Sequence, residues 1–97
     1  MIDQLEEGIH FLKFGADWCG PCRALEPALN KFEESNINRV KVHRLDVDKE
    51  FDEASKYGIR NIPTIIIVKN GEVVDRINGV QTVQNLTNKL EEYVESN

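Results

Sequence analysis

The sequence is organised around five consecutive residues, Trp18-Cys19-Gly20-Pro21-Cys22. Before them, the apolar run from Ile9 to Phe14 predicts a β-strand, and Gly15 follows it. After them, apolar residues recur at three- and four-residue spacing up to about Asn36, which predicts a helix beginning at Gly20. The two cysteines are therefore expected where a strand passes into the first turn of a helix.

This position favours redox chemistry at the two cysteines. Cys19 falls at the helix N-terminus, where unpaired N–H groups and the helix dipole stabilise a thiolate. The spacing lets the sulfurs close a disulfide, so Cys19 is the expected nucleophile and Cys22 the resolving, less exposed cysteine. A purely structural disulfide is disfavoured, because so short a loop constrains the unfolded chain little. We also expect no metal, since apart from carboxylates only His10 and His43 could complete a zinc site and neither has ligand spacing to a partner.

The rest of the chain predicts three more strands, at 40–47, 64–69 and 72–77. The charges within 40–47 favour a sheet edge, whereas the unbroken apolar run in 64–69 favours a central strand. Asn70-Gly71 is a strong signal for the turn of a hairpin, so the last two strands are expected to pair antiparallel. The first two strands, joined through a helix, are expected to pair in parallel.

Three further helical segments complete the predicted order. Asp48 is the expected cap of a helix that runs to Lys56, and Thr82 is the expected cap of the last helix. Asp3 is the expected cap of a short N-terminal helical turn. The predicted fold class is therefore α/β: a mixed four-stranded sheet flanked by helices, in the order β-α-β-α-β-β-α, behind that short helix.

Length and composition exclude several classes of protein. The 97 residues suit a single domain spanning 1–97. Twelve basic and 17 acidic residues give a net charge of −5, which argues against nucleic-acid binding. The longest aliphatic run, Ile65 to Val68, is too short to cross a membrane. The N-terminus lacks the basic and apolar regions of a signal peptide, so we expect a cytoplasmic protein, and we expect it to be a monomer.

Longer motifs resemble those of the thioredoxin family. Residues 15–23 resemble its active-site segment, 56–64 its second signature and 69–72 its hairpin. The resemblance runs from about Ile9 to the C-terminus, and Trp-Cys-Gly-Pro-Cys followed by Ile-Pro-Thr is far more specific than two spaced cysteines alone. It implies the thioredoxin fold, with a cis peptide bond before Pro63 beside the cysteines. It also implies a flat apolar surface for docking substrates, formed by Trp18, Gly20, Pro21, Ile62, Pro63, Gly79 and Val80.

The resemblance further implies the activity of a protein-disulfide reductase, an electron carrier that serves cell redox homeostasis. It implies no bound cofactor: electrons come from NADPH through a flavin-containing thioredoxin reductase. That reductase and disulfide-containing protein substrates are the implied partners. Two alternatives stay open, namely a more oxidising disulfide isomerase or oxidant, and a thioredoxin-like binding subunit of a larger complex.

The sequence departs from the family pattern at two charged positions. Lys13 stands where the family usually has a buried Asp, and Arg44 stands where it often has a Lys paired with that Asp. Two cations thus replace a carboxylate–ammonium pair, and we expect the Lys13 ammonium to reach water along its stem. A sharper hypothesis is that Lys13 and Arg44 stabilise a thiolate at Cys22 or Cys19 and so tune its redox potential. The short N-terminus also leaves no room for the family's extra first strand.

Overall fold

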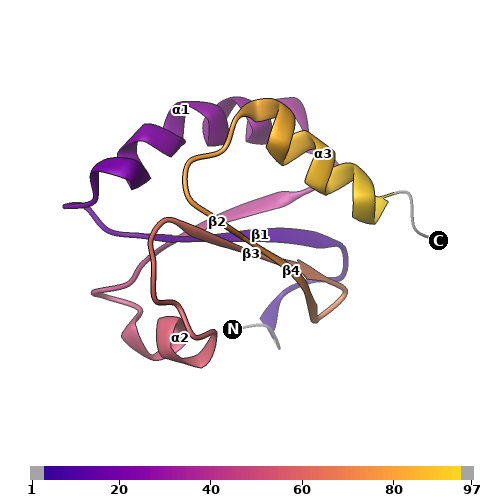
Figure 1. Cartoon of the computed structure of the whole chain (residues 1–97). Coiled ribbons are helices and arrows are strands. Elements are labelled where there is room, and N and C mark those ends of the chain that lie inside the picture. The colour runs from indigo at the N-terminus through magenta and orange to yellow at the C-terminus, as the bar shows by residue number, and fades with distance from the viewer. Residues whose placement is uncertain (1–3, 95–97) are drawn as a thin grey trace.

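The computed structural model describes residues 4–94, and its elements follow the predicted order. Their bounds are β1 Ile9–Gly15, α1 Gly20–Ser35, β2 Lys41–Asp46, α2 Phe51–Lys56, β3 Thr64–Lys69, β4 Glu72–Asn78 and α3 Val83–Val94. The strands form one sheet in the order β2-β1-β3-β4 (Figure 1). β1 pairs in parallel with β2 and antiparallel with β3, and β3 pairs antiparallel with β4. The mixed sheet expected from the sequence is confirmed.

Each face of the sheet carries its own hydrophobic cluster, because successive side chains of a strand point to opposite faces. α1 and α3 cover one face, and α2 covers the other (Figure 1). The cluster under α1 and α3 contains Ile9, Phe11, Leu25, Leu29, Phe32, Val40, Ile65, Ile67, Leu86 and Leu90. The cluster under α2 contains Leu12, Phe14, Leu45, Ala54, Ile66 and Val68. β1 and β3 are the two central strands of the sheet and contribute to both clusters.

The expected positions of the strands in the sheet are also confirmed. β3 lies between β1 and β4, and it is buried from Thr64 to Val68. β2 lies at an edge, and no further strand within residues 4–94 pairs with its outer side. The hairpin turn holds Asn70 at φ 51° and Gly71 at φ 86°, the left-handed geometry that favours this dipeptide.

Of the two N-caps predicted for the later helices, one is confirmed and the other is wrong. Thr82 caps α3 as expected, since its Oγ1 accepts a hydrogen bond from the Asn85 N–H at 3.0 Å. The expectation that Asp48 caps α2 is wrong, because the helix begins at Phe51. The Asp48 N–H instead donates to Asp46 Oδ1 at 2.8 Å, which makes this segment a side-chain-stabilised turn ahead of the helix.

The expected N-terminal helical turn begins at Asp3, which lies outside the described residues. Within residues 4–94, no α-helix precedes β1. Gly8 ends this segment at φ 112°, a backbone conformation that side chains rarely tolerate. The chain therefore enters β1 through a sharp bend.

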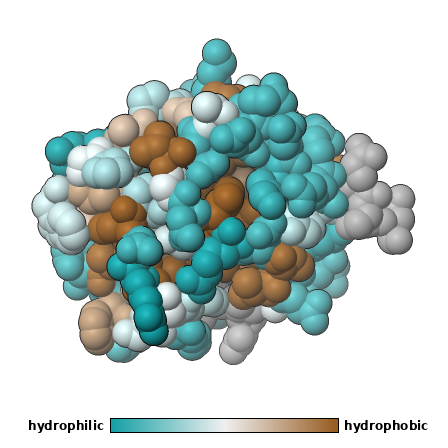
Figure 2. All heavy atoms as spheres, viewed as in Figure 1, coloured by the Kyte–Doolittle hydropathy of each residue, from teal (hydrophilic) through white to brown (hydrophobic). Residues whose placement is uncertain are grey.

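The surface seen in Figure 2 mixes polar side chains with separate apolar patches. The exposed large apolar residues are Trp18, Ile37, Phe51, Val73, Val80 and Val94. No helix among the described residues is long and apolar enough to cross a membrane. Two of these exposed residues, Trp18 and Val80, belong to the surface expected around the cysteines.

Candidate functional site

The two cysteines lie where β1 passes into α1. β1 ends at Gly15, and Cys19 is the N-cap of α1. The Cys22 N–H donates a hydrogen bond to Cys19 Sγ at 3.1 Å, so a free N–H of the first helical turn points at that sulfur. The two sulfurs form a disulfide, with their Cα atoms 5.3 Å apart. Both residues are buried, Cys19 at 4% and Cys22 at 2% exposure. Cys22 is thus the less exposed cysteine, as expected, but the difference in exposure is slight.

The loop before β3 approaches the disulfide from another part of the chain. The peptide bond between Ile62 and Pro63 is cis, as the resemblance implied. The Ile62 carbonyl oxygen lies 3.9 Å from Cys19 Sγ, and the Ile62 side chain packs on the cluster of Ala16, Cys19 and Cys22. The Gly79 N–H donates to the Pro63 carbonyl at 2.8 Å, which ties the end of β4 to the same loop. Three distant segments therefore meet at the cysteines.

The side chains expected to form a docking surface lie on these three segments. Trp18 is 67% exposed and Val80 is 52% exposed, while Ile62 is half-buried and Pro63 is buried. Gly20 and Pro21 are exposed in the first turn of α1. Trp18 Nε1 donates to Asp48 Oδ2 at 2.8 Å, which orients the exposed ring. Sequence reasoning missed this role of Asp48, because it assigned that side chain to a helix cap.

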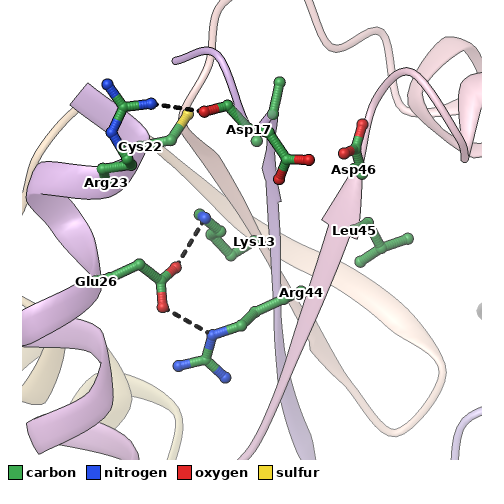
Figure 3. Close-up of a pocket in the computed structure, with 10 residues that line it drawn as sticks. Lys13, Asp17, Cys22, Arg23, Glu26, Arg44, Leu45 and Asp46 are labelled. Carbon is green, nitrogen blue, oxygen red and sulfur yellow. Dashed lines mark hydrogen bonds and ion pairs between the residues drawn. The ribbon is translucent and has the colours of Figure 1, made fainter. Parts of the chain in front are cut away.

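The expectation that the Lys13 ammonium reaches water is wrong. Lys13 is only 8% exposed, and its Nζ lies 2.8 Å from Glu26 Oε2 (Figure 3). Arg44 Nε donates to the other oxygen of the same carboxylate at 3.0 Å. The two cations therefore do not stand unpaired, because Glu26 of α1 bridges them. The sequence carries one signal for this: Glu26 follows Cys22 by four residues, which puts both on one side of the helix.

The charges around Glu26 stabilise its carboxylate. Partial burial acts to raise the pKa of Glu26, but hydrogen bonds from Lys13 and Arg44 hold that pKa below its ordinary value. A pocket of about 320 Å³ opens beside this group. It reaches from the disulfide to the edge strand β2, and its lining includes Lys13, Gly15, Cys22, Glu26, Arg44 and Asp46 (Figure 3).

The two histidines lie away from the disulfide and bind each other. His10 Nδ1 lies 3.0 Å from His43 Nε2, and His10 Nε2 lies 2.8 Å from the Glu6 carbonyl oxygen. His10 is buried, so this arrangement satisfies its polar ring within the protein. Within residues 4–94, no three histidine, cysteine or acidic side chains converge as a metal site requires.

Comparison with known proteins identifies a family for the chain. The family model for thioredoxin matches residues 2–92. A thioredoxin from Staphylococcus saprophyticus is 34% identical over 92 residues, which are 95% of this chain and 88% of that protein. A thioredoxin from Bacillus subtilis is 36% identical over 89 residues, 89% of this chain and 86% of that protein.

A solved structure agrees with these relatives. A single-site mutant of thioredoxin from Halobacterium salinarum superposes with a TM-score of 0.85 at 35% identity, over 94% of this chain and 79% of that chain. The fold, the Cys19–Cys22 pair and the cis bond before Pro63 fit the same family. The chain belongs to the thioredoxin family, and membership implies thiol–disulfide oxidoreductase activity.

Proposed function

We propose that this protein reduces disulfide bonds in other proteins through Cys19 and Cys22. The Cys19 thiolate attacks one sulfur of a substrate disulfide, and a mixed disulfide forms as the other substrate sulfur leaves as a thiolate. Cys22 then loses its proton and attacks the Cys19 sulfur. The Cys19–Cys22 bond forms, and the second substrate sulfur leaves with its electron pair. The substrate gains two electrons and two protons, and the protein ends oxidised.

One observation carries this proposal, namely the position of Cys19 at the N-cap of a long helix. The Cys22 N–H donates to the Cys19 sulfur at 3.1 Å. A hydrogen bond to a sulfur anion is stronger than one to a neutral sulfur, and the helix dipole adds to it. The site therefore favours the thiolate of Cys19, which is the nucleophile in the first step of the exchange.

The surface around the disulfide supports recognition of a protein chain. We propose that an extended substrate segment lies across the apolar surface and pairs with the backbone of Ile62. Trp18, which is exposed and oriented by Asp48, serves as an aromatic anchor. The proposed contact residues are Trp18, Gly20, Pro21, Ile62, Pro63, Gly79 and Val80.

The exchange needs no bound cofactor, because sulfur carries the electrons. The family implies a thioredoxin reductase as the partner that reduces Cys19–Cys22 again. We propose that NADPH supplies the electrons through a flavin-containing enzyme of that class. The measurement that links the chain to this partner is reduction of the Cys19–Cys22 disulfide by such an enzyme, monitored as consumption of NADPH.

The activity is tested by reduction of insulin with a chemical dithiol as electron source. The wild-type protein is expected to accelerate the reaction, and Cys19→Ser and Cys22→Ser are each expected to abolish the acceleration. Cys22→Ser should accumulate a mixed disulfide with substrate, since nothing resolves it, whereas Cys19→Ser should not. Turnover that persists in Cys19→Ser would contradict the assignment of the nucleophile.

A more oxidising activity is the second candidate, and the two cations near Cys22 favour it. Equilibration in graded thiol–disulfide buffers separates the two functions. A potential near about −270 mV indicates a reductase, whereas one above about −200 mV indicates an isomerase or oxidant. A binding subunit is recognised differently: a Cys19→Ser, Cys22→Ser double variant would keep the protein's role in the cell.

A further inference from the structure

Three charged side chains meet on the inner side of Cys22. Lys13 comes from β1, Glu26 from α1 and Arg44 from β2, and the Glu26 carboxylate receives a hydrogen bond from each cation (Figure 3). Arg44 is held further by Glu33 at 3.0 Å and by Asn30 at 2.7 Å. The two cations therefore have fixed positions, and Lys13 is the one buried deepest.

Gly15 brings the Lys13 ammonium close to the Cys22 sulfur. A Cβ built on Gly15 would lie 3.0 Å from Lys13 Nζ and 3.1 Å from Cys22 Sγ. The two atoms are therefore at most about 6 Å apart, with no side chain of residue 15 between them. At about that distance, in partly buried surroundings, a unit charge changes a neighbour's titration by between about half a unit and two units.

We propose that the Lys13 ammonium stabilises the Cys22 thiolate that resolves the mixed disulfide, and that Glu26 is the positioning residue that holds the ammonium there. This inference rests on the proposed exchange reaction. Before the second attack, the Cys22 thiol gives its proton to solvent through the pocket. Its thiolate then bonds to Cys19 Sγ, and the substrate sulfur leaves with the electron pair of the broken bond. Lys13 acts through its charge and takes no part in the proton transfer.

Other charges face the same pocket and modulate this effect. Arg23 of α1 adds a positive charge, and its guanidinium donates to the Asp17 carbonyl. Asp17 and Asp46 oppose the effect of the cations. Asp46 is engaged in part elsewhere, because its Oδ1 accepts from the Asp48 N–H. The Lys13 ammonium, which lies over Gly15 on the same side as the Cys22 sulfur, is the cation that these contacts leave next to Cys22.

The test measures the titration of Cys22 by itself. In a Cys19→Ser background Cys22 is the one remaining thiol, and ultraviolet absorbance reports its thiolate as the pH is raised. Lys13→Met keeps an apolar stem and removes the charge. It is expected to raise the titration midpoint of Cys22 by about one unit, a tenfold loss of thiolate at a given pH. Lys89→Met is the matched control, because it breaks an ion pair with Asp75 outside the pocket, and no shift is expected.

A second variant is expected to move the midpoint the other way. Glu26→Gln keeps an oxygen that can accept from Lys13 but removes the negative charge that offsets the ammonium. The titration midpoint of Cys22 is expected to fall. If Lys13 and Glu26 had only a structural role, the two substitutions would have no reason to shift this midpoint in opposite directions. An unchanged or lowered midpoint in Lys13→Met overturns the proposal, and so does a raised midpoint in Glu26→Gln. If Lys13→Met does not fold, the Glu26→Gln result decides.

The two proposals fail separately. Insulin reduction by the wild-type protein tests the proposed function without reference to Lys13. A protein that reduces insulin but shows no shift in either variant keeps its function and loses this inference. A protein that shows both shifts but reduces no insulin keeps the electrostatic coupling and loses the proposed activity.

Discussion

Two polar side chains are buried on β1, and the protein satisfies them in different ways. Lys13 points toward α1, where a carboxylate of that helix lies 2.8 Å from its ammonium. His10 lies on the opposite face of the strand, because the two positions differ by an odd number of residues. Its ring contacts His43 at 3.0 Å and the Glu6 carbonyl at 2.8 Å. Lys13 requires a charged partner, whereas neutral hydrogen bonds suffice for His10.

The two ends of β1 therefore have different roles. The Lys13 end affects the electrostatics of the cysteine site, whereas the His10 end stabilises the fold. A neutral His10 must donate from Nε2 to the Glu6 carbonyl, so its Nδ1 accepts from His43. These hydrogen bonds tie the segment before β1 to the sheet, and because they join neutral groups they contribute little electrostatic potential at the cysteines. The Lys13–Glu26 pair instead sits beside a sulfur whose chemistry depends on charge. Changes at the Lys13 end are therefore expected to alter stability and redox behaviour together.

The largest effect on stability is expected from Glu26→Ala. This change leaves the buried Lys13 ammonium without its carboxylate, and desolvated charges without partners are strongly destabilising. Because Glu26 is partly exposed and the pocket admits water, we expect a loss of about 2 kcal/mol in the free energy of unfolding. Urea unfolding, monitored by circular dichroism, measures it.

Glu33→Ala is the matched control for that prediction. Glu33 also binds Arg44, but both side chains are more than a third exposed, at 37% and 34%. Its loss should change the free energy of unfolding by less than about 1 kcal/mol. Equal effects of the two substitutions would mean that the burial of Lys13 does not matter.

The contrast also shows where reading the sequence succeeds. The strand order and the position of the cysteines follow from local patterns: apolar runs, the Asn70-Gly71 turn and the helical spacing after Cys22. Glu26 was visible as a polar residue of that helix, but its partner was not. Lys13 and Glu26 lie on different elements, and only the packing of α1 on β1 decides that they meet. The pairing of His10 with His43 depends in the same way on the register between β1 and β2.

A smaller effect is expected at the histidine end, and it depends on pH. Burial above all, and then the positive charge of Lys41, hold the pKa of His43 below its ordinary value, although Glu33 acts to raise it. As the pH falls below about 6.5, the unfolded chain takes up a proton at residue 43 before the folded chain does. The free energy of unfolding should therefore decrease from about pH 7 toward pH 5 and level off below the folded pKa.

His43→Gln removes this titration while keeping a side chain that can hydrogen-bond to His10. The slope of stability against pH should flatten in that window. The carboxylates do not interfere there, because the pKa values of Glu26 and Asp75 are lowered and their contributions are lost only at more acidic pH. A slope that survives unchanged in His43→Gln would assign the pH dependence to other groups.

The smallest effect is expected from Lys41→Ala, which tests whether charge matters at the His10 end at all. Lys41 is the partner of His10 in the β1–β2 register, and its Nζ lies 2.7 Å from Glu6 Oε1. The two side chains are 57% and 70% exposed, so water and salt screen their attraction and their ordering opposes it. The urea midpoint should therefore stay within experimental error at both low and high salt. A loss of unfolding free energy comparable to that of Glu26→Ala would mean that ion pairs stabilise both ends of β1. The electrostatic potential near Cys22 could then no longer be attributed to the buried Lys13–Glu26 pair in particular.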